Sequence, residues 1–275
     1  MEELLVEETH RDYLGGQASY LALRSLDYDA FDGFFKDGTV SGNAPHLVEA
    51  FKEATRWDHT CFLEVVLPGV PDVRSVFHRR TKILDVGSGT GDWVLRMSAS
   101  FPLPAYTGVE SDPVAMKKAV DRAKDASPAS VRFMSGTAEE MPFSNEFDLV
   151  YLGEVLCVMS QRTKALKKCW EALSPGGALV VAEGLLDDKE GWRGATYGLM
   201  RGMQLDFALL GASFLSRSEL IGLLREAGFR RLRFLPVGSG LWFAVARKPE
   251  PWKARTFLLQ MGRQHTLPQA RQPPS

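Results

Sequence analysis

A glycine-rich segment between a strand and a helix constrains the fold of this chain more than any other feature. The apolar run TKILDV at residues 81–86 leads directly into GSGTG at residues 87–91, and a helical pattern begins with Asp92 and Trp93. Glycine has no Cβ, so such a loop turns sharply and lets a ligand approach its backbone closely. A strand, a glycine loop and a helix in this order predict a ligand site and not a purely structural turn.

Two common nucleotide-binding loops do not fit this segment. The fingerprint of NAD-binding proteins places its third glycine where this chain has Asp92. A phosphate-binding loop requires Gly-Lys followed by Ser or Thr, and no such sequence follows Gly91.

Short apolar runs alternate with helical patterns between residues 81 and 247, which indicates βαβ units and a parallel sheet. The last helical pattern has Ser216 or Ser218 as its candidate N-cap. Two final strands, at residues 230–235 and 241–247, are separated by five residues. Because a parallel crossover needs a much longer connection, we expect a mostly parallel sheet closed by a C-terminal antiparallel hairpin.

The chain divides into three parts. Residues 1–78 carry apolar side chains at helical spacing and predict a small, mainly helical module, in which residues 61–67 could form a single strand. We expect this module to pack on the sheet domain, residues 79–248, or on a second copy of itself. The Pro-rich tail, residues 249–275, lacks an apolar anchor at its end and predicts a frayed terminus.

Composition excludes several classes of protein. A net charge of -1 argues against a general nucleic-acid binder. No apolar run approaches the roughly 18 residues of a membrane span, and the acidic first residues differ from a signal peptide. Three cysteines without a CxxC pair indicate neither a disulfide framework nor a metal site. We expect a cytoplasmic protein with no membrane or nucleic-acid partner.

Further segments follow the glycine loop in a distinctive order. The second strand ends at Glu110, SGTAEEMPF occupies residues 135–143 after the third strand, and LSPGG occupies residues 173–177. Together with DVGSGTG at residues 85–91, they resemble the motifs of class I S-adenosylmethionine-dependent methyltransferases. More closely, the layout resembles the small-molecule type with an amino-terminal helical, winged-helix-like module. The resemblance implies an α/β, Rossmann-like, seven-stranded sheet with S-adenosylmethionine as cofactor.

The resemblance also implies roles for individual residues. Asp85 and the glycine loop would hold the methionine end of the cofactor, and Glu110 would accept hydrogen bonds from both ribose hydroxyls. The family usually has an Asp at the position of Thr137, so we expect a weaker or water-mediated contact with adenine. The predicted cofactor-binding residues are Asp85, Gly87, Ser88, Gly89, Gly91, Glu110, Ser111, Thr137, Ala138 and Leu152.

The catalytic base of the hydroxyl-specific branch is missing from its usual place. That branch has His in a Val-Leu-His context after the fourth strand, where this chain has Val155-Leu156-Cys157. Glu154 is the nearest replacement and is the predicted catalytic residue. The alternative is a solvated or helix-capping carboxylate.

An apolar insert after the fifth strand predicts the acceptor site. Its aromatic and Met side chains would form an adaptable apolar wall, although their spacing also fits ordinary core packing. Tyr13 and Tyr20 of the amino-terminal module could close over the cofactor, or pack in the core. The predicted substrate-binding residues are Tyr20, Trp192, Tyr197 and Met200.

These features predict methyl transfer to an O, N or C nucleophile of a small, largely apolar metabolite. The step is an in-line displacement, which the protein promotes by alignment and exclusion of water. Two alternatives stay open: an RNA or protein methyltransferase, and a non-catalytic S-adenosylmethionine-binding protein. Against the first, the fourth strand is followed by residues 152–155, LGEV, and not by the Asn/Asp-Pro-Pro-Tyr/Phe tetrapeptide of nucleic-acid amino methylation. The amino-terminal module offers a surface for homodimerisation.

Overall fold

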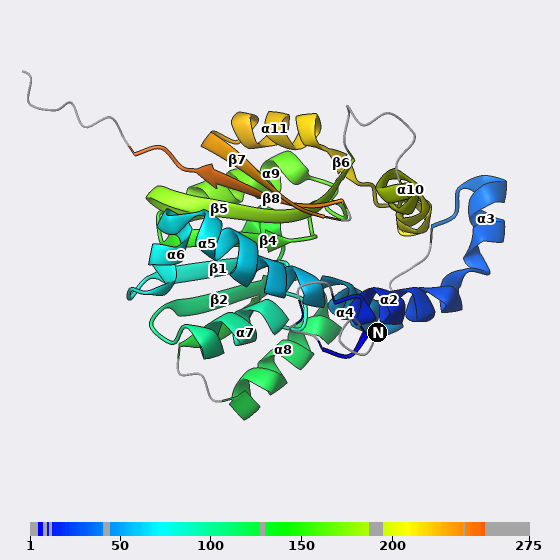
Figure 1. Ribbon diagram of the computed structural model, residues 1–275, viewed down its shortest axis with the longest axis horizontal. Helices are drawn as coiled ribbons and strands as arrows, with labels where there is room; N and C mark the ends of the chain where they lie inside the picture. The colour runs from blue at the N-terminus through cyan, green and yellow to red at the C-terminus, as the bar shows by residue number, and fades with distance from the viewer. Residues whose placement is uncertain are drawn as a thin grey trace, which may run out of the picture.

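A computed structural model describes most of the chain, including the whole central sheet (Figure 1). The described residues are 5–7, 10, 13–40, 45–126, 130–186, 195–238 and 240–250.

The sheet has the predicted mixed topology. Strands run in the order β3-β2-β1-β4-β5-β8-β7, with the first five parallel and β8 antiparallel to both β5 and β7. Their bounds are β1 Lys82–Val86, β2 Ala105–Glu110, β3 Val131–Ser135, β4 Phe147–Gly153, β5 Leu173–Leu186, β7 Arg230–Gly238 and β8 Leu241–Arg247. The prediction of a Rossmann-like α/β fold is therefore confirmed, with one short addition: β6, Leu215–Ser216, pairs parallel to the end of β5.

Apolar side chains on both faces of the sheet explain why the strands read as continuous apolar runs. Successive residues of a strand point to opposite faces, so Ile83 and Leu84 enter two separate cores. Helices α9 (Arg162–Ala172) and α11 (Arg217–Glu226) cover one face, and α6 (Pro71–Phe77) and α7 (Asp92–Ser100) cover the other. Helix α8, Pro113–Ala126, connects β2 to β3.

Helix α11 begins with one of the two N-caps predicted from the sequence. The Ser216 hydroxyl accepts from the Glu219 N–H at 3.1 Å, and the Glu219 carboxylate accepts from the Ser216 N–H at 2.7 Å. This capping box selects Ser216, and not Ser218, as the N-cap.

The described part of residues 1–78 is helical, as predicted. Its elements are α2 Gly15–Arg24, η1 Ser25–Asp27, α3 Ala30–Asp37, α4 Pro45–Cys61, η2 Phe62–Val66, α5 Leu67–Gly69 and α6. The alternative of a strand at residues 61–67 is wrong, because a π-helical turn continues α4 there. Phe62 drives this outcome, since its fully buried ring packs edge-on against Trp93 and Tyr151, with centroids 5.4 and 5.6 Å away.

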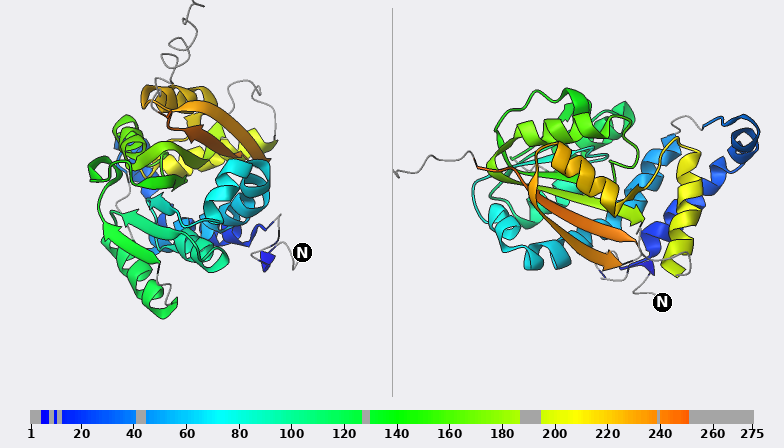
Figure 2. Two further views of the ribbon diagram at one scale, coloured as in Figure 1. Left: turned by 90° about the vertical axis from the view of Figure 1, so that its left-hand side faces the viewer. Right: turned by 90° about the horizontal axis from the view of Figure 1, so that it is seen from above.

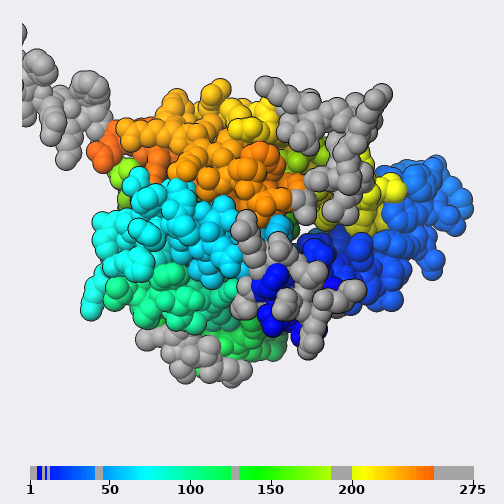
Figure 3. Space-filling view, viewed as in Figure 1, coloured from blue at the N-terminus to red at the C-terminus, as the bar shows by residue number. Residues whose placement is uncertain are grey.

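Three helices gather at one end of the sheet. Figures 1 and 2 show α2 and α4 beside α10, Ala195–Ala208, with α3 projecting beyond them. In the space-filling view, α10 and the amino-terminal helices form one continuous end of the molecule (Figure 3). Their shared apolar cluster includes Tyr20, Ala54, Met200 and also Cys157, from the loop after β4. These helices therefore cover the carboxyl ends of β4 and β5.

Among the described residues, no helix has both the length and the apolar character needed to cross a membrane. The three cysteines are buried, and none of them forms a disulfide bond.

Candidate functional site

The glycine loop adopts the backbone conformation that its sequence predicts. Gly87 and Gly91 have φ values of +73° and +79°, a region that side chains with a Cβ rarely adopt. A Cβ at Gly87 would also lie 2.6 Å from a methyl carbon of Val155. Backbone N–H groups of Gly87 and Ser88 donate to the Val109 carbonyl at 2.8 and 3.0 Å. The loop is thereby fixed against β2 and the loop that follows β4.

Glu110 holds the same region together through its carboxylate. Its Oε2 accepts from the Gly89 N–H at 2.8 Å, and its Oε1 accepts from the N–H groups of Ser111 and Asp112 at 2.8 and 2.7 Å. A carboxylate has about four lone-pair positions, so it retains capacity for a further donor. The structure thus brings Glu110 and Ser111 to the glycine loop, and their contact with a ribose remains a prediction.

Asp85 lies beneath the loop near the end of β1. Burial raises the pKa of this carboxyl well above its ordinary value, and the charge of Glu110 raises it further. Two polar atoms of the loop region, Ser88 Oγ and Trp93 Nε1, are buried without a hydrogen-bond partner among the described residues. Ser88 Oγ lies against β2, 2.7 Å from where a Cβ at Gly108 would be, and the Trp93 ring belongs to the apolar core beside Tyr151.

The remaining predicted cofactor residues lie along the same edge. Thr137 precedes the short helix η3, Ala138–Glu140, which follows β3. Ala138 and Leu152 belong to the apolar core on one face of the sheet. Because the Leu152 side chain is fully buried there, only its backbone is positioned to line a ligand site.

The predicted catalytic residue, Glu154, has an unusual backbone. Its φ is +52°, in the left-handed region, and its N–H donates to the Ala182 carbonyl at 2.8 Å. Burial raises the pKa of its carboxyl to about 7. A pKa near neutrality suits a group that accepts or donates a proton at physiological pH.

Two further buried carboxyls, whose pKa values the charge of Glu154 raises, were missed by the sequence analysis. Asp58 comes from α4 and Glu183 from β5, and their side chains are only 2% and 1% exposed. The Leu156 N–H donates to one Glu183 oxygen at 2.6 Å. Burial and the charge of Glu154 raise the pKa of Glu183 to about 8. We call Asp58, Glu154 and Glu183 the acid cluster.

The sequence contains a signal for each of these two residues, Asp58 and Glu183. Asp58 continues the apolar stripe of α4 formed by Leu47, Ala50 and Ala54, where a charged side chain is unexpected. Glu183 interrupts the apolar strand β5. Each observation marks a buried acid, but neither says which distant groups lie near it.

Cys157 occupies the position of the absent histidine and is a buried thiol. Burial raises its pKa well above the ordinary value, with a further contribution from the charge of Glu183. The surrounding loop is fixed by Arg162, whose guanidinium donates to the carbonyls of Leu156, Cys157 and Ser213 at 2.7, 3.0 and 2.9 Å.

The predicted substrate residues fall into two groups. Tyr20 and Met200 are buried in the apolar cluster that contains Cys157, and the Tyr20 hydroxyl donates to the Asp206 carboxylate. Trp192 lies outside the described residues, and of Tyr197 only the backbone, within α10, is described. Their roles toward a substrate remain predictions.

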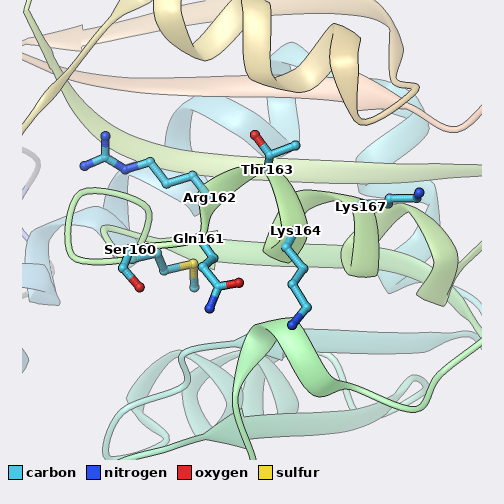
Figure 4. Close-up of a pocket in the computed structure, with 7 residues that line it drawn as sticks. Ser160, Gln161, Arg162, Thr163, Lys164 and Lys167 are labelled. Atoms are coloured by element: carbon cyan, nitrogen blue, oxygen red, sulfur yellow. The ribbon is translucent and has the colours of Figure 1, made fainter.

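A surface pocket of about 580 Å³ lies at the start of α9. It is lined by Met159, Ser160, Gln161, Arg162, Thr163, Lys164 and Lys167. Figure 4 shows Arg162 and Lys164 pointing in different directions, so the pocket's cationic groups do not converge on one point. It contains none of the predicted site residues.

Comparisons with known proteins agree with this geometry. Residues 83–177 match the family model described as a methyltransferase domain. The demethylmenaquinone methyltransferase of Listeria welshimeri is 26% identical over 176 residues, which cover 58% of this chain and 75% of that protein. That of Staphylococcus aureus is 37% identical over 105 residues, which cover 38% of this chain and 43% of that protein.

Solved structures show the same fold. PigF with S-adenosylhomocysteine superposes with a TM-score of 0.64 at 18% identity, over 90% of this chain and 77% of that one. The S-adenosylmethionine-dependent methyltransferase SibL, in its apo form, gives a TM-score of 0.60 at 21% identity. That alignment covers 75% of this chain and 60% of SibL.

The methyltransferase match begins in β1 and ends in β5, so it contains the glycine loop, Glu110 and Glu154. The fixed glycine loop and the acidic residue beside it occupy the positions that the sequence analysis predicted for a cofactor site. We conclude that the chain contains a methyltransferase domain of the S-adenosylmethionine-dependent kind, matched over residues 83–177.

Proposed function

We propose that this enzyme methylates an O, N or C nucleophile of a small, largely apolar metabolite of the natural-product kind. The proposal rests on one observation: helices cover the carboxyl ends of β4 and β5. There α2, α4 and α10 enclose the Cys157 loop in an apolar cluster. Such an enclosure suits a small molecule and excludes a folded macromolecule from the reacting atoms. The demethylmenaquinone methyltransferases among the relatives support an acceptor of this size.

Different residues of the chain would perform different parts of methyl transfer. Asp85 and the glycine loop would hold the amino acid end of the cofactor, and Glu110 would hold its ribose. The bound cofactor supplies a methyl group on a positively charged sulfur. The covering helices would exclude water and align the acceptor, which is the main source of rate in a displacement of this kind. Glu154 would accept a proton where the acceptor must lose one.

We further propose a cytoplasmic homodimer formed through the amino-terminal helices. Large apolar side chains are exposed on the described part of this segment, and dimerisation would remove them from water. These residues are Leu14, Leu21, Leu26, Tyr28 and Phe35.

Radiolabelled S-adenosylmethionine tests the proposed acceptor class. The purified enzyme is incubated with separate low-mass, RNA and protein fractions of a cell extract, beside a Glu110→Ala control. We expect label in the low-mass fraction only, and none with the control. Label in RNA or protein would contradict the proposal, and a titration with S-adenosylhomocysteine would show independently whether the cofactor site is intact.

A further inference from the structure

The buried acid of β5, Glu183, holds the loop that follows β4. Its neighbours two residues away on the strand, Val181 and Leu185, belong to the apolar core that also contains Leu156, so Glu183 lies on that face of the sheet. There the Leu156 N–H donates to Glu183 Oε1 at 2.6 Å, with Leu156 fully buried and Glu183 only 1% exposed. A buried N–H ordinarily needs a partner, and here a side chain of the neighbouring strand supplies it.

The same loop is held from its other side by Arg162, at the start of α9. The guanidinium donates to the carbonyls of Leu156 and Cys157 at 2.7 and 3.0 Å, and also to the Ser213 carbonyl at 2.9 Å. Both backbone polar groups of Leu156 are therefore bound by side chains from outside the loop. A loop fixed in this way has one backbone arrangement and not several.

The arrangement includes the strained backbone of Glu154. A φ of +52° is unusual for a residue with a Cβ and persists only where the surroundings fix it. The Glu154 N–H donates to the carbonyl of Ala182, which directly precedes Glu183 in β5. Adjacent residues of one strand thus hold the loop on both sides of Val155, and Val155 itself packs against Gly87 of the glycine loop.

We propose that Glu183 is a positioning residue for methyl transfer, which fixes the backbone of residues 154–157 and thereby places Glu154 beside the cofactor site. The inference rests on the proposed function, in which Glu154 accepts the proton. Glu183 acts through an acceptor oxygen and not through its charge. Burial, together with the charge of Glu154, raises the pKa of Glu183 to about 8, and a protonated carboxyl still has an oxygen that accepts the Leu156 N–H.

Two substitutions of Glu183 separate its acceptor oxygen from its charge. Glu183→Gln keeps the shape and an acceptor oxygen, whereas Glu183→Leu leaves the Leu156 N–H without its partner. Tyr106→Phe is the matched control, because it removes a buried hydrogen bond, from Tyr106 to the Phe101 carbonyl at 2.9 Å, near the amino end of β2 and on the opposite face of the sheet. Glu64→Gln, a change at an exposed acid, controls for the loss of a carboxyl.

The buried thiols report directly on the loop. Cys157 belongs to it, and its Sγ donates to the Glu154 carbonyl at 3.3 Å, whereas Cys61 and Cys169 lie in helices. The protein is treated with N-ethylmaleimide under native conditions, and mass spectrometry follows each cysteine separately. We expect Glu183→Leu to label Cys157 about tenfold faster relative to Cys61 and Cys169, since local opening breaks one buried hydrogen bond fewer. Glu183→Gln and both controls should keep the wild-type ratio.

Methyl transfer and cofactor binding give the second readout. With the low-mass extract fraction as acceptor, Glu183→Leu should lower the rate at saturating S-adenosylmethionine by about tenfold or more, because misplaced reacting groups are costly. Its affinity for S-adenosylhomocysteine should be nearly unchanged, since Val109 and Glu110 fix the glycine loop independently. Glu183→Gln should keep the rate and its inflection near pH 7.

Two results would overturn the inference. Equal loss of rate in Glu183→Gln and Glu183→Leu would show that Glu183 acts through its charge or its proton, and not as a positioning residue. Faster labelling of all three cysteines in step in Glu183→Leu would show a global loss of stability in place of a local opening. A wild type that binds S-adenosylhomocysteine but labels no low-mass acceptor would overturn the proposed function and the catalytic half of the inference. Cysteine labelling would still decide whether Glu183 holds the loop.

Discussion

At the scale of single residues, one carboxylate connects the glycine loop to the rest of the cofactor site. Glu110 accepts three backbone hydrogen bonds that come from Gly89, Ser111 and Asp112. These bonds orient its oxygens before any ligand arrives, which lowers the cost of ordering the site on binding.

Glu110→Ala should therefore weaken the binding of S-adenosylhomocysteine by about tenfold or more. Hydrogen bonds to a charged group contribute about 1.5–3 kcal/mol each, and the ribose would lose its acceptor. Isothermal titration calorimetry measures the change, with Glu140→Ala, an exposed acid, as the control. Unchanged affinity in a folded Glu110→Ala protein would remove Glu110 from the ribose site.

Glu154→Gln should leave the binding of S-adenosylhomocysteine unchanged and lower turnover. The wild-type rate should rise with pH through about 7, the pKa of Glu154, because the ionised carboxylate is the base. This inflection should be absent from the pH profile of the variant. A wild-type rate with the same inflection would show that Glu154 takes no part in the proton transfer.

At the scale of elements, a buried ion pair joins the helices that cover the site. Arg24 on α2 is fully buried, and its guanidinium contacts the Asp206 carboxylate on α10 at 2.8 Å. Tyr20 donates to the same carboxylate, and Asp27 pairs with Arg24. Segments about 180 residues apart in the chain are thereby held in one arrangement.

Asp206→Ala should destabilise the protein by about 3–5 kcal/mol, since it leaves Arg24 buried with one partner fewer. The double variant Arg24→Met, Asp206→Leu should recover much of this loss, because it removes both charges. Urea unfolding measures the change. Asp121→Ala, which removes an exposed partner of Lys117, should have little effect. Equal effects of Asp206→Ala and Asp121→Ala would contradict a structural role for the buried pair.

The helices and strands were largely predictable from the sequence, whereas the tertiary contacts between them were not. The longer strands and the two candidate caps, Ser216 and Ser218, follow from local sequence patterns, which is why they were predicted, whereas the two-residue strand β6 was not. Helical continuation through Phe62 depends on packing against Trp93 and Tyr151, which no local pattern reports. The acid cluster consists of residues from three segments far apart in the chain. The sequence does not show which distant segments are neighbours, so the cluster could be recognised only in the structure.

At the scale of the whole molecule, buried acids make stability depend on pH. Glu154 and Glu183 have pKa values of about 7 and about 8 in the folded protein, above the ordinary value of 4.5. Between these limits the folded state binds protons that the unfolded state releases. Their favourable contribution is therefore complete below about pH 4.5 and is lost as the pH rises through about 8.

The free energy of unfolding should accordingly fall between about pH 5 and about pH 8, and the fall should be shallower in Glu183→Gln. Urea unfolding at several pH values, with Glu64→Gln as the control, measures this slope. Parallel pH curves for the wild type and Glu183→Gln would show that Glu183 already ionises normally in the folded protein.

Asp58 belongs to a helix of the amino-terminal segment, whereas the glycine loop and Glu110 belong to the sheet. The amino-terminal segment thus supplies α2, α4 and Asp58 at the covered end of the sheet, while the residues proposed to hold the cofactor lie in a separate stretch of sequence. Substitutions on the buried sides of α2 and α4 would therefore alter the cover over the carboxyl ends of β4 and β5 and leave the glycine loop and Glu110 in place.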